Sequence, residues 1–275
     1  MSDVFSQGRY QVRLDWGPAG AATLGADVVV VVDVLSFSTA VTVAVDRGTR
    51  VIPCPWSDER AAALAAAHGA TLAVGRLEAT RAGAVVAPSL SPAGLLVAPS
   101  VPRLVLPSPN GSSIAAVLAD AGAGVAAGCL RNARAAVLAD AGAGVAAGCL
   151  RNARAVAGHV ARAVTAGQSV AVVAAGERWA DGSLRPCLED HLGAGAVLAH
   201  LRATGPGDGF SPEASAAATL FDASRADLGR LLRECVSGRE LVGSGFGADV
   251  VVAAELDACT TVPVLVGGAF TDGHV

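Results

Sequence analysis

The sequence predicts a three-layer α/β/α fold with a largely parallel or mixed sheet, followed by a helical C-terminal third. Short apolar runs alternate with Ala-rich amphipathic stretches along most of the chain, which is the pattern of strands and helices taking turns. The run Val28–Val32 is apolar at every position, as is typical of a strand that is covered on both faces. The segment Leu188–Val242 has mainly helical patterning, which predicts the helical third.

The individual elements follow from apolar runs, helical spacing and turn residues. Strands are expected at Tyr10–Trp16, Asp27–Val32, Thr49–Pro53, Thr71–Val74, Leu104–Pro107, Val125–Gly128, Ser169–Ala174 and, near the end, Val262–Val266. Helices are expected at Thr39–Asp46, Asp58–His68, Ser112–Ala121 and Arg154–Thr165. The region Arg81–Val101 is rich in Pro, Ser and Ala and predicts a long loop or an edge hairpin.

The chain of 275 residues is expected to form a single α/β domain over residues 1–275, with residues 176–187 as the place where two lobes would divide. Residues 115–135 and 135–155 have identical sequences, which indicates a tandem duplication. Two copies are too few for a solenoid. The fold must therefore accept an extra unit or displace one copy, and either Asn132 or Asn152 holds the native position.

Composition excludes several classes of function. The chain contains no lysine, and its 20 basic residues are all arginine, so Walker A loops, pyridoxal phosphate enzymes and lysine-based aldolases are excluded. A net charge of −4 without a basic run indicates no basic surface of the kind that binds nucleic acid. No apolar run reaches membrane-spanning length. Six cysteines without a CxxC pair favour free thiols and a cytoplasmic location.

Polar residues follow two of the expected strands directly. Asp33 comes after Val28–Val32, and Ser38 and Thr39 follow before a helical pattern. In open α/β sheets ligands bind beyond the carboxyl ends of the strands, where a carboxylate can hold a metal and hydroxyl groups can bind an anion. The simpler alternative is that these side chains only cap the helix.

Two further segments allow the same pair of interpretations. Asn110, Gly111 and Ser112 follow Leu104–Pro107, and they predict either a phosphate-binding turn or a plain turn with a serine cap. Glu189 and Asp190 open a helix, where one carboxylate can cap while the other binds a metal, or both can simply favour the helix dipole.

Taken in order, these segments resemble the 2-phosphosulfolactate phosphatase family. The matching segments are Val31–Thr39, Ser91-Pro92, Pro109–Ser112, Gly148–Ala153, Ala175-Gly176, Leu188–Gly195 and Gly245–Asp249. The resemblance covers about Val28 to Val252. It implies a magnesium-dependent phosphatase that converts 2-phosphosulfolactate into sulfolactate and phosphate, a step of coenzyme M biosynthesis in some organisms.

The resemblance also suggests roles for particular residues. Asp33 with Glu189 or Asp190 would hold one Mg²⁺, and attack would come either from water or from an aspartate. Phosphoryl and substrate contacts are expected from Asn110, Gly111 and Ser112, from Ser38 and Thr39 opposite them, and from Asn152 or its twin Asn132. The expected partner is a small anionic organophosphate; a homodimer is left open.

The chain departs from the family pattern at several positions. Ser36 stands where the family has an arginine, Gly75-Arg76-Leu77 lacks the family's glutamate, and Ala174 and Gly193 replace cysteines. Loss of an arginine that pairs with an anion removes about 1.5–3 kcal/mol, for which Arg76 or Arg151 could substitute. The alternatives are therefore a phosphatase of another small organophosphate, or an inactive structural paralogue damaged by the duplication.

Overall fold

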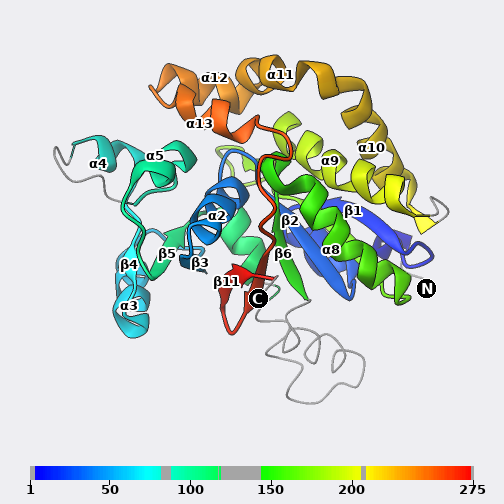
Figure 1. Cartoon of the computed structure of the whole chain (residues 1–275), viewed down its shortest axis with the longest axis horizontal. Helices are drawn as coiled ribbons and strands as arrows, with labels where there is room; N and C mark the ends of the chain where they lie inside the picture. Colours follow the sequence, from blue (N-terminus) through cyan, green and yellow to red (C-terminus); the bar gives the residue numbers. More distant parts are fainter. Residues whose placement is uncertain (1–3, 82–87, 117, 119–143, 206–208, 274–275) are drawn as a thin grey trace.

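The fold was analysed in a computed structural model, which describes residues 4–81, 88–116, 118, 144–205 and 209–273 (Figure 1). The strands are β1 (Val12–Trp16), β2 (Val28–Val32), β3 (Arg50–Cys54), β4 (Thr71–Leu72), β5 (Arg103–Pro107), β6 (Val145–Gly148), β7 (Val170–Ala174), β8 (Glu177–Arg178), β9 (Leu184–Arg185), β10 (Pro263–Val266) and β11 (Ala269–Asp272). The α-helices are α1 (Gly17–Leu24), α2 (Phe37–Asp46), α3 (Glu59–His68), α4 (Arg76–Arg81), α5 (Pro92–Val97), α8 (Ala153–Thr165), α9 (Leu188–Thr204), α10 (Pro212–Ser224), α11 (Leu228–Glu234), α12 (Val236–Gly243) and α13 (Gly247–Ala253). Residues 111–116 are also helical.

Within the described residues, the main sheet has nine strands in the order β1-β7-β2-β6-β10-β11-β3-β5-β4. The strands β1, β7, β2 and β6 are mutually parallel, as are β3, β5 and β4. The hairpin β10–β11 joins these two groups through antiparallel pairing on both sides. The two parallel groups therefore run in opposite directions, and the predicted α/β fold with a mixed sheet is confirmed.

Both faces of the sheet are covered by helices. Along β2, Val28, Val30 and Val32 pack into the core that includes α8 and α9, whereas Val29 and Val31 pack against α1 and Ile114. The strands β3 and β5 divide their side chains in the same way, between α2 and α5 on one face and α3 on the other. Because every second valine of β2 faces a different helical layer, the uninterrupted apolar run is accounted for.

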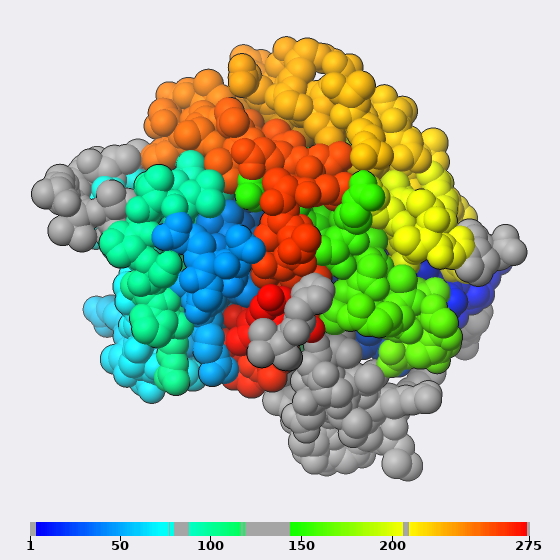
Figure 2. Space-filling model, viewed as in Figure 1, coloured from blue at the N-terminus to red at the C-terminus, as the bar shows by residue number. Residues whose placement is uncertain are grey.

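Helix α9 approaches the end of β2 very closely. A Cβ on Gly193 would lie 2.5 Å from Cγ2 of Val34 and 2.9 Å from Cγ1 of Val32, so only glycine allows this distance. The helices α10–α13 continue as an arc along the upper edge of the molecule in Figure 1, and in Figure 2 this arc covers the edge above α5 and α9. Helix α13 packs against α5, which brings the C-terminal third of the chain to the strand ends.

The structure corrects several sequence expectations. The region Arg81–Val101 contains the helix α5, which begins at Pro92 behind the side-chain cap of Ser91, so the expected loop or edge hairpin was wrong over those residues. Helix α1 and strand β11 were not expected. Residues 176–187, the expected place of a division, contain the small hairpin β8–β9. No helix in the described part of the chain has the length and apolar character needed to cross a membrane.

The duplicated segment is described only in part. The expected strand Val125–Gly128, the end of the helix Ser112–Ala121 and Asn132 lie outside the described residues. The equivalent segment of the second copy forms β6 at Val145–Gly148, and Asn152 follows it. The second copy therefore supplies the strand that pairs in parallel with β2.

Because the two copies are identical, removing residues 116–135 or residues 136–155 produces the same shorter chain. One copy contains all the residues that form β6 and the start of α8, so we expect the shortened protein to fold. Its circular dichroism spectrum and its melting temperature, within about 4 °C, should match those of the full chain. Loss of the cooperative melting transition on deletion would contradict the assignment of one copy as extra.

Candidate active site

The carboxylate of Asp33 lies directly after β2 and is only 5% exposed as a residue. Its Oδ1 accepts a hydrogen bond from the backbone N–H of Phe37 at 3.0 Å, and its Oδ2 accepts one from the backbone N–H of Gly111 at 3.0 Å. The first bond caps the start of α2, as the simpler interpretation expects. The second bond joins the end of β2 to the turn after β5, which is 78 residues away in the chain.

Asp190 connects two more strand ends. Its Oδ1 accepts from the backbone N–H of Val34 at 2.7 Å, and its Oδ2 accepts from the backbone N–H of Gly176 at 2.8 Å. The first turn of α9 is thereby fixed to the segments that follow β2 and β7. The structure thus brings Asp33 and Asp190 together at one edge of the sheet.

Glu189 is 3% exposed and has a different environment from Asp190. Within the described part of the chain, no backbone N–H donates to its carboxylate, and it lies beside the thiol of Cys235. Burial and the negative charge of Glu189 raise the pKa of the Cys235 thiol to about 12. The adjacent carboxylates of Glu189 and Asp190 therefore diverge, with Asp190 bound to backbone amides and Glu189 buried beside Cys235.

Glu177 is a fourth acidic residue of this group, and the sequence analysis missed it. It opens β8 after Gly176, and its Oε2 accepts a hydrogen bond from Nδ2 of Asn110 at 2.8 Å. An acidic residue three positions beyond a strand that is apolar throughout was the available signal, similar to the one that marked Asp33. Arg185, also missed, faces Glu177 from the other strand of the hairpin and lowers its pKa.

The electrostatics of the group are dominated by burial and like charge. Burial raises the pKa of Asp190 well above its ordinary value, and the charges of Asp33 and Glu189 raise it further. Burial likewise raises the pKa of Asp33, with the charge of Glu189 adding to it, while the N–H groups and Arg76 act in the opposite direction. Burial followed by the charge of Asp33 raises the pKa of Glu177. A positive charge placed among these carboxylates would relieve the repulsion.

The acidic group provides hard oxygen donors, which suit Mg²⁺. Within the described residues, no three His, Cys, Asp or Glu side chains are arranged as they stand to enclose an ion. Mg²⁺ does not require such a cage, because it keeps several waters and uses only one or two carboxylates. Asp33 and Glu189 fit this mode, since each oxygen of Asp33 accepts a single N–H bond and, among the residues that the structure describes, no backbone N–H donates to Glu189.

The hydroxyl groups expected to contact phosphate donate to backbone carbonyls. Ser38 Oγ donates to Val31 O at 2.9 Å and accepts from the N–H of Asp33 at 3.0 Å, and Thr39 Oγ1 donates to Val34 O at 2.8 Å. Ser112 Oγ donates to Leu106 O at 3.1 Å. These side chains hold the turns that carry Asp33 and Gly111; their contact with a phosphoryl group stays a prediction.

Asn152 and Arg151 are used within the protein. The Nδ2 of the fully buried Asn152 donates to Thr42 Oγ1, Ala147 O and Thr261 O at 3.1–3.2 Å. Arg151 forms an ion pair with Glu255. The structure therefore brings neither Asn152 nor Arg151 to the acidic group. Asn132, which corresponds to Asn152 in the first copy of the duplicated segment, lies outside the described residues.

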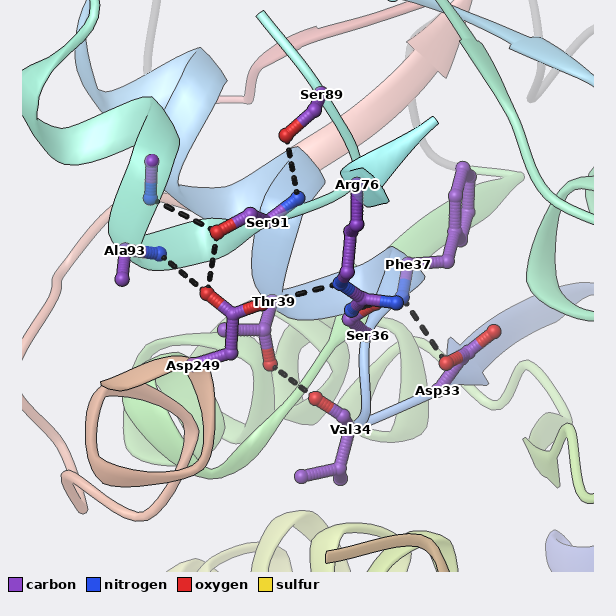
Figure 3. Close-up of polar contacts among 11 residues, drawn as sticks. Asp33, Val34, Ser36, Phe37, Thr39, Arg76, Ser89, Ser91, Ala93 and Asp249 are labelled. Carbon is purple, nitrogen blue, oxygen red and sulfur yellow. Dashed lines mark hydrogen bonds and ion pairs between the residues drawn. The ribbon is translucent and has the colours of Figure 1, made fainter. Parts of the chain in front are cut away.

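Of the two arginines that the sequence offered as substitutes, Arg76 is the one that reaches the site (Figure 3). Its Nη2 donates to Ser36 Oγ, and its Nε donates to Oδ2 of Asp249 at 3.0 Å. The Asp249 side chain is 1% exposed and also accepts from Ser91 Oγ and from the N–H of Ala93. A guanidinium group held from α4 and α13 thus lies beside Ser36, where the family pattern has its arginine.

The fold and the site define an α/β protein with a buried acidic group at the ends of β2, β7 and β5, flanked by arginines. The family model described as 2-phosphosulpholactate phosphatase matches residues 134–268 of the chain, which confirms the resemblance drawn from the sequence motifs. The match implies a phosphatase and includes Glu177, Glu189, Asp190 and Asp249. A search of individually curated proteins finds no match.

Replacing Gly111 with alanine should disrupt the contact between the two strand ends. Its Cβ would lie 2.3 Å from Cδ1 of Phe37 and 2.9 Å from Oδ2 of Asp33, so we expect a loss of about 1–3 kcal/mol in the free energy of unfolding. The control is Gly158→Ala on the exposed side of α8, where a Cβ meets no atom within 4 Å. Urea denaturation measures both, and equal stability of the two variants would contradict the close packing.

The stability of the metal-free protein should depend on pH through its acidic group. The pKa values of Asp33, Glu177 and Asp190 are higher in the folded protein than in the unfolded chain. At a pH below the pKa values of the unfolded chain, these side chains are protonated in both states and the folded protein keeps its full stability. This contribution to stability is lost as the pH rises through the folded values. In EDTA, we expect a lower free energy of unfolding at about pH 8 than at about pH 6.

Glu177→Gln removes one of the carboxyl groups with a raised pKa. It should therefore reduce the decline in the free energy of unfolding between the two pH values. The exposed Glu213 provides the matched control, because Glu213→Gln removes a carboxylate of the same type away from the acidic group and should keep the decline of the natural protein. Urea denaturation at the two pH values measures the effect. An unchanged decline in Glu177→Gln would show that this carboxylate is not coupled to the others.

Proposed function

We propose that this protein hydrolyses a small phosphate monoester with the help of Mg²⁺, and that 2-phosphosulfolactate, giving sulfolactate and phosphate, is the first substrate to test. The observation that carries the proposal is the convergence of Asp33, Glu177, Glu189 and Asp190 on one edge of the sheet, although Asp33 is 144 or more residues from the other three in the chain. The family match supports the reaction class.

A phosphate monoester resists attack because its oxygens are negatively charged, so catalysis requires positioning and charge neutralisation. Bound Mg²⁺, held by Asp33 and Glu189 with waters, would supply charge neutralisation for the phosphoryl oxygens. Asp190 then has a positioning role, because both of its oxygens are used to fix the segments after β2 and β7. Arg76 neutralises a second anionic group of the substrate.

Glu177 is suited to give a proton to the leaving alcohol. Its pKa is raised by burial and by the charge of Asp33, so it retains a proton nearer to neutral pH than an ordinary glutamic acid does. The amide Nδ2 of Asn110 holds Oε2 at 2.8 Å, which leaves Oε1 to carry the proton. The reaction then requires an ionised Asp33 and a protonated Glu177.

A second candidate is a phosphatase of the same fold that acts on a different organophosphate. Ser36 favours this alternative, because the guanidinium beside it comes from Arg76 on another element and not from residue 36 itself. The position of a guanidinium group determines where a second anion is bound. The reaction and the acidic group would be the same in both cases.

The purified protein should release inorganic phosphate from 2-phosphosulfolactate or 2-phospholactate when Mg²⁺ is present, and EDTA should abolish this release. Asp33→Asn and Glu189→Gln should each lower the rate roughly 100-fold or more, whereas the exposed control Glu213→Gln should keep it. A colorimetric phosphate assay measures all three variants. Rates like those of the natural protein in Asp33→Asn and Glu189→Gln would remove the roles proposed for these carboxylates.

The melting temperature of the purified protein distinguishes an enzyme from an inactive structural paralogue. Ligands that bind the folded protein raise its melting temperature by mass action, so Mg²⁺ together with phosphate should raise it if the site is intact. The absence of both a melting shift and phosphate release would favour the paralogue.

A further inference from the structure

A cavity of about 650 Å³ opens beside Arg76 at the ends of β4 and β5. This volume is within the range of small-molecule binding sites. The lining is mostly apolar, with Leu72, Val74, Leu90 and Pro107 beside the polar Arg76 and Glu78. A space of this size and character is larger and less polar than a three-carbon substrate with several charges requires.

Arg76 connects this cavity to the acidic group. It lines the cavity, its Nη2 donates to Ser36 Oγ, and its charge lowers the pKa of Asp33. Pro107 lines the cavity from the end of β5, and Gly111, which donates to Asp33, follows four residues later. A molecule whose phosphoryl group lies at Asp33 would therefore extend past Arg76 into the cavity.

The position of Arg76 is fixed from the side of the C-terminal helices. Asp249 of α13 accepts from its Nε, and Ser91 and Ala93 of α5 hold Asp249 in turn. The Arg76 side chain remains 17% exposed, so it is anchored yet open to a ligand. Asp249 is in this sense a positioning residue for the arginine.

We propose that the substrate is a phosphate monoester of a 2-hydroxy acid that carries an apolar side arm, with its carboxylate at Arg76 and its arm in the cavity. This inference rests on the proposed function and narrows its substrate class. Each methylene group moved from water into an apolar environment strengthens binding roughly three- to four-fold. A short, fully charged substrate would leave the apolar lining in contact with water and would not gain this contribution.

The test compares three phosphate esters in the presence of Mg²⁺: 2-phospholactate, 2-phosphosulfolactate and the phosphate ester of 2-hydroxy-4-methylpentanoate. The last of these adds a branched apolar arm to the lactate skeleton. We expect its kcat/KM to exceed that of 2-phospholactate at least about ten-fold. A value equal to or below that of 2-phospholactate would overturn the inference while leaving a phosphatase in place.

A substitution in the cavity provides a second measurement. Gly75 lines the cavity and does not have a left-handed backbone conformation, and a Cβ there would meet no atom within 4 Å, so Gly75→Leu adds an apolar side chain at the cavity wall. It should lower the ratio of the branched to the lactate kcat/KM at least about ten-fold. Gly158→Leu, at the equally open exposed position on α8, should keep the ratio. An unchanged ratio in Gly75→Leu would contradict the assignment of the cavity.

Measurements of binding without turnover distinguish a failure of the proposed phosphatase activity from a failure of the proposed apolar-arm site. If no ester releases phosphate, the proposed function fails, and the melting temperature still tests the cavity because ligand binding raises it regardless of reaction. A larger shift with the branched ester than with 2-phospholactate, reduced in Gly75→Leu, supports the apolar arm. Equal shifts for the two esters overturn it.

Discussion

Backbone amides that hold two buried carboxylates are the constraint on which the site depends. Asp33 accepts from Phe37 and Gly111, and Asp190 accepts from the segments after β2 and β7. Buried carboxylates are costly unless hydrogen bonds compensate for the lost water. These four bonds supply that compensation, and at the same time they join the ends of three strands and the start of α9 into one unit. A change in any of these turns therefore alters the positions of the two carboxylates.

The amides do not remove the repulsion between the acidic side chains, which is expressed in the raised pKa values of Asp33, Glu177 and Asp190. The fold keeps these charges close at a cost in stability, as functional sites commonly do. Its own cations stand at the edge of the group instead of within it: Arg76 is bound by Asp249, and Arg185 comes from the β8–β9 hairpin.

The C-terminal helices have a direct part in this arrangement. Helix α13 supplies Asp249, which fixes Arg76, and Cys235, between α11 and α12, lies against Glu189. Asp249 of α13, the helix that packs on α5, thus binds the arginine of α4 that lies beside Ser36. The serine at residue 36 and the packing of the C-terminal helices are thus linked through Arg76. The same arginine also lines the apolar cavity.

The sequence by itself determined the α/β class, most of the strands, the position of Asp33 at the end of an apolar run and the positions of Glu189 and Asp190 at the start of a helix, because periodicity and local turn chemistry are short-range properties. It did not identify α5, since a Pro- and Ser-rich segment is read as a loop when the cap at Ser91 and the packing against α13 are unknown. Only the tertiary structure brought Glu177 and Arg185 to the site, turned Ser38, Thr39 and Ser112 toward backbone carbonyls, and placed Asn152 in the core. The positions of Arg185 and Asn152 depend on which segments meet across the sheet, and contacts between residues far apart in the chain leave no local pattern. The three hydroxyl groups bond carbonyls only five to seven residues earlier in the chain, where the folded geometry of the turn, and not the residue type, decides between a carbonyl and a ligand as the partner.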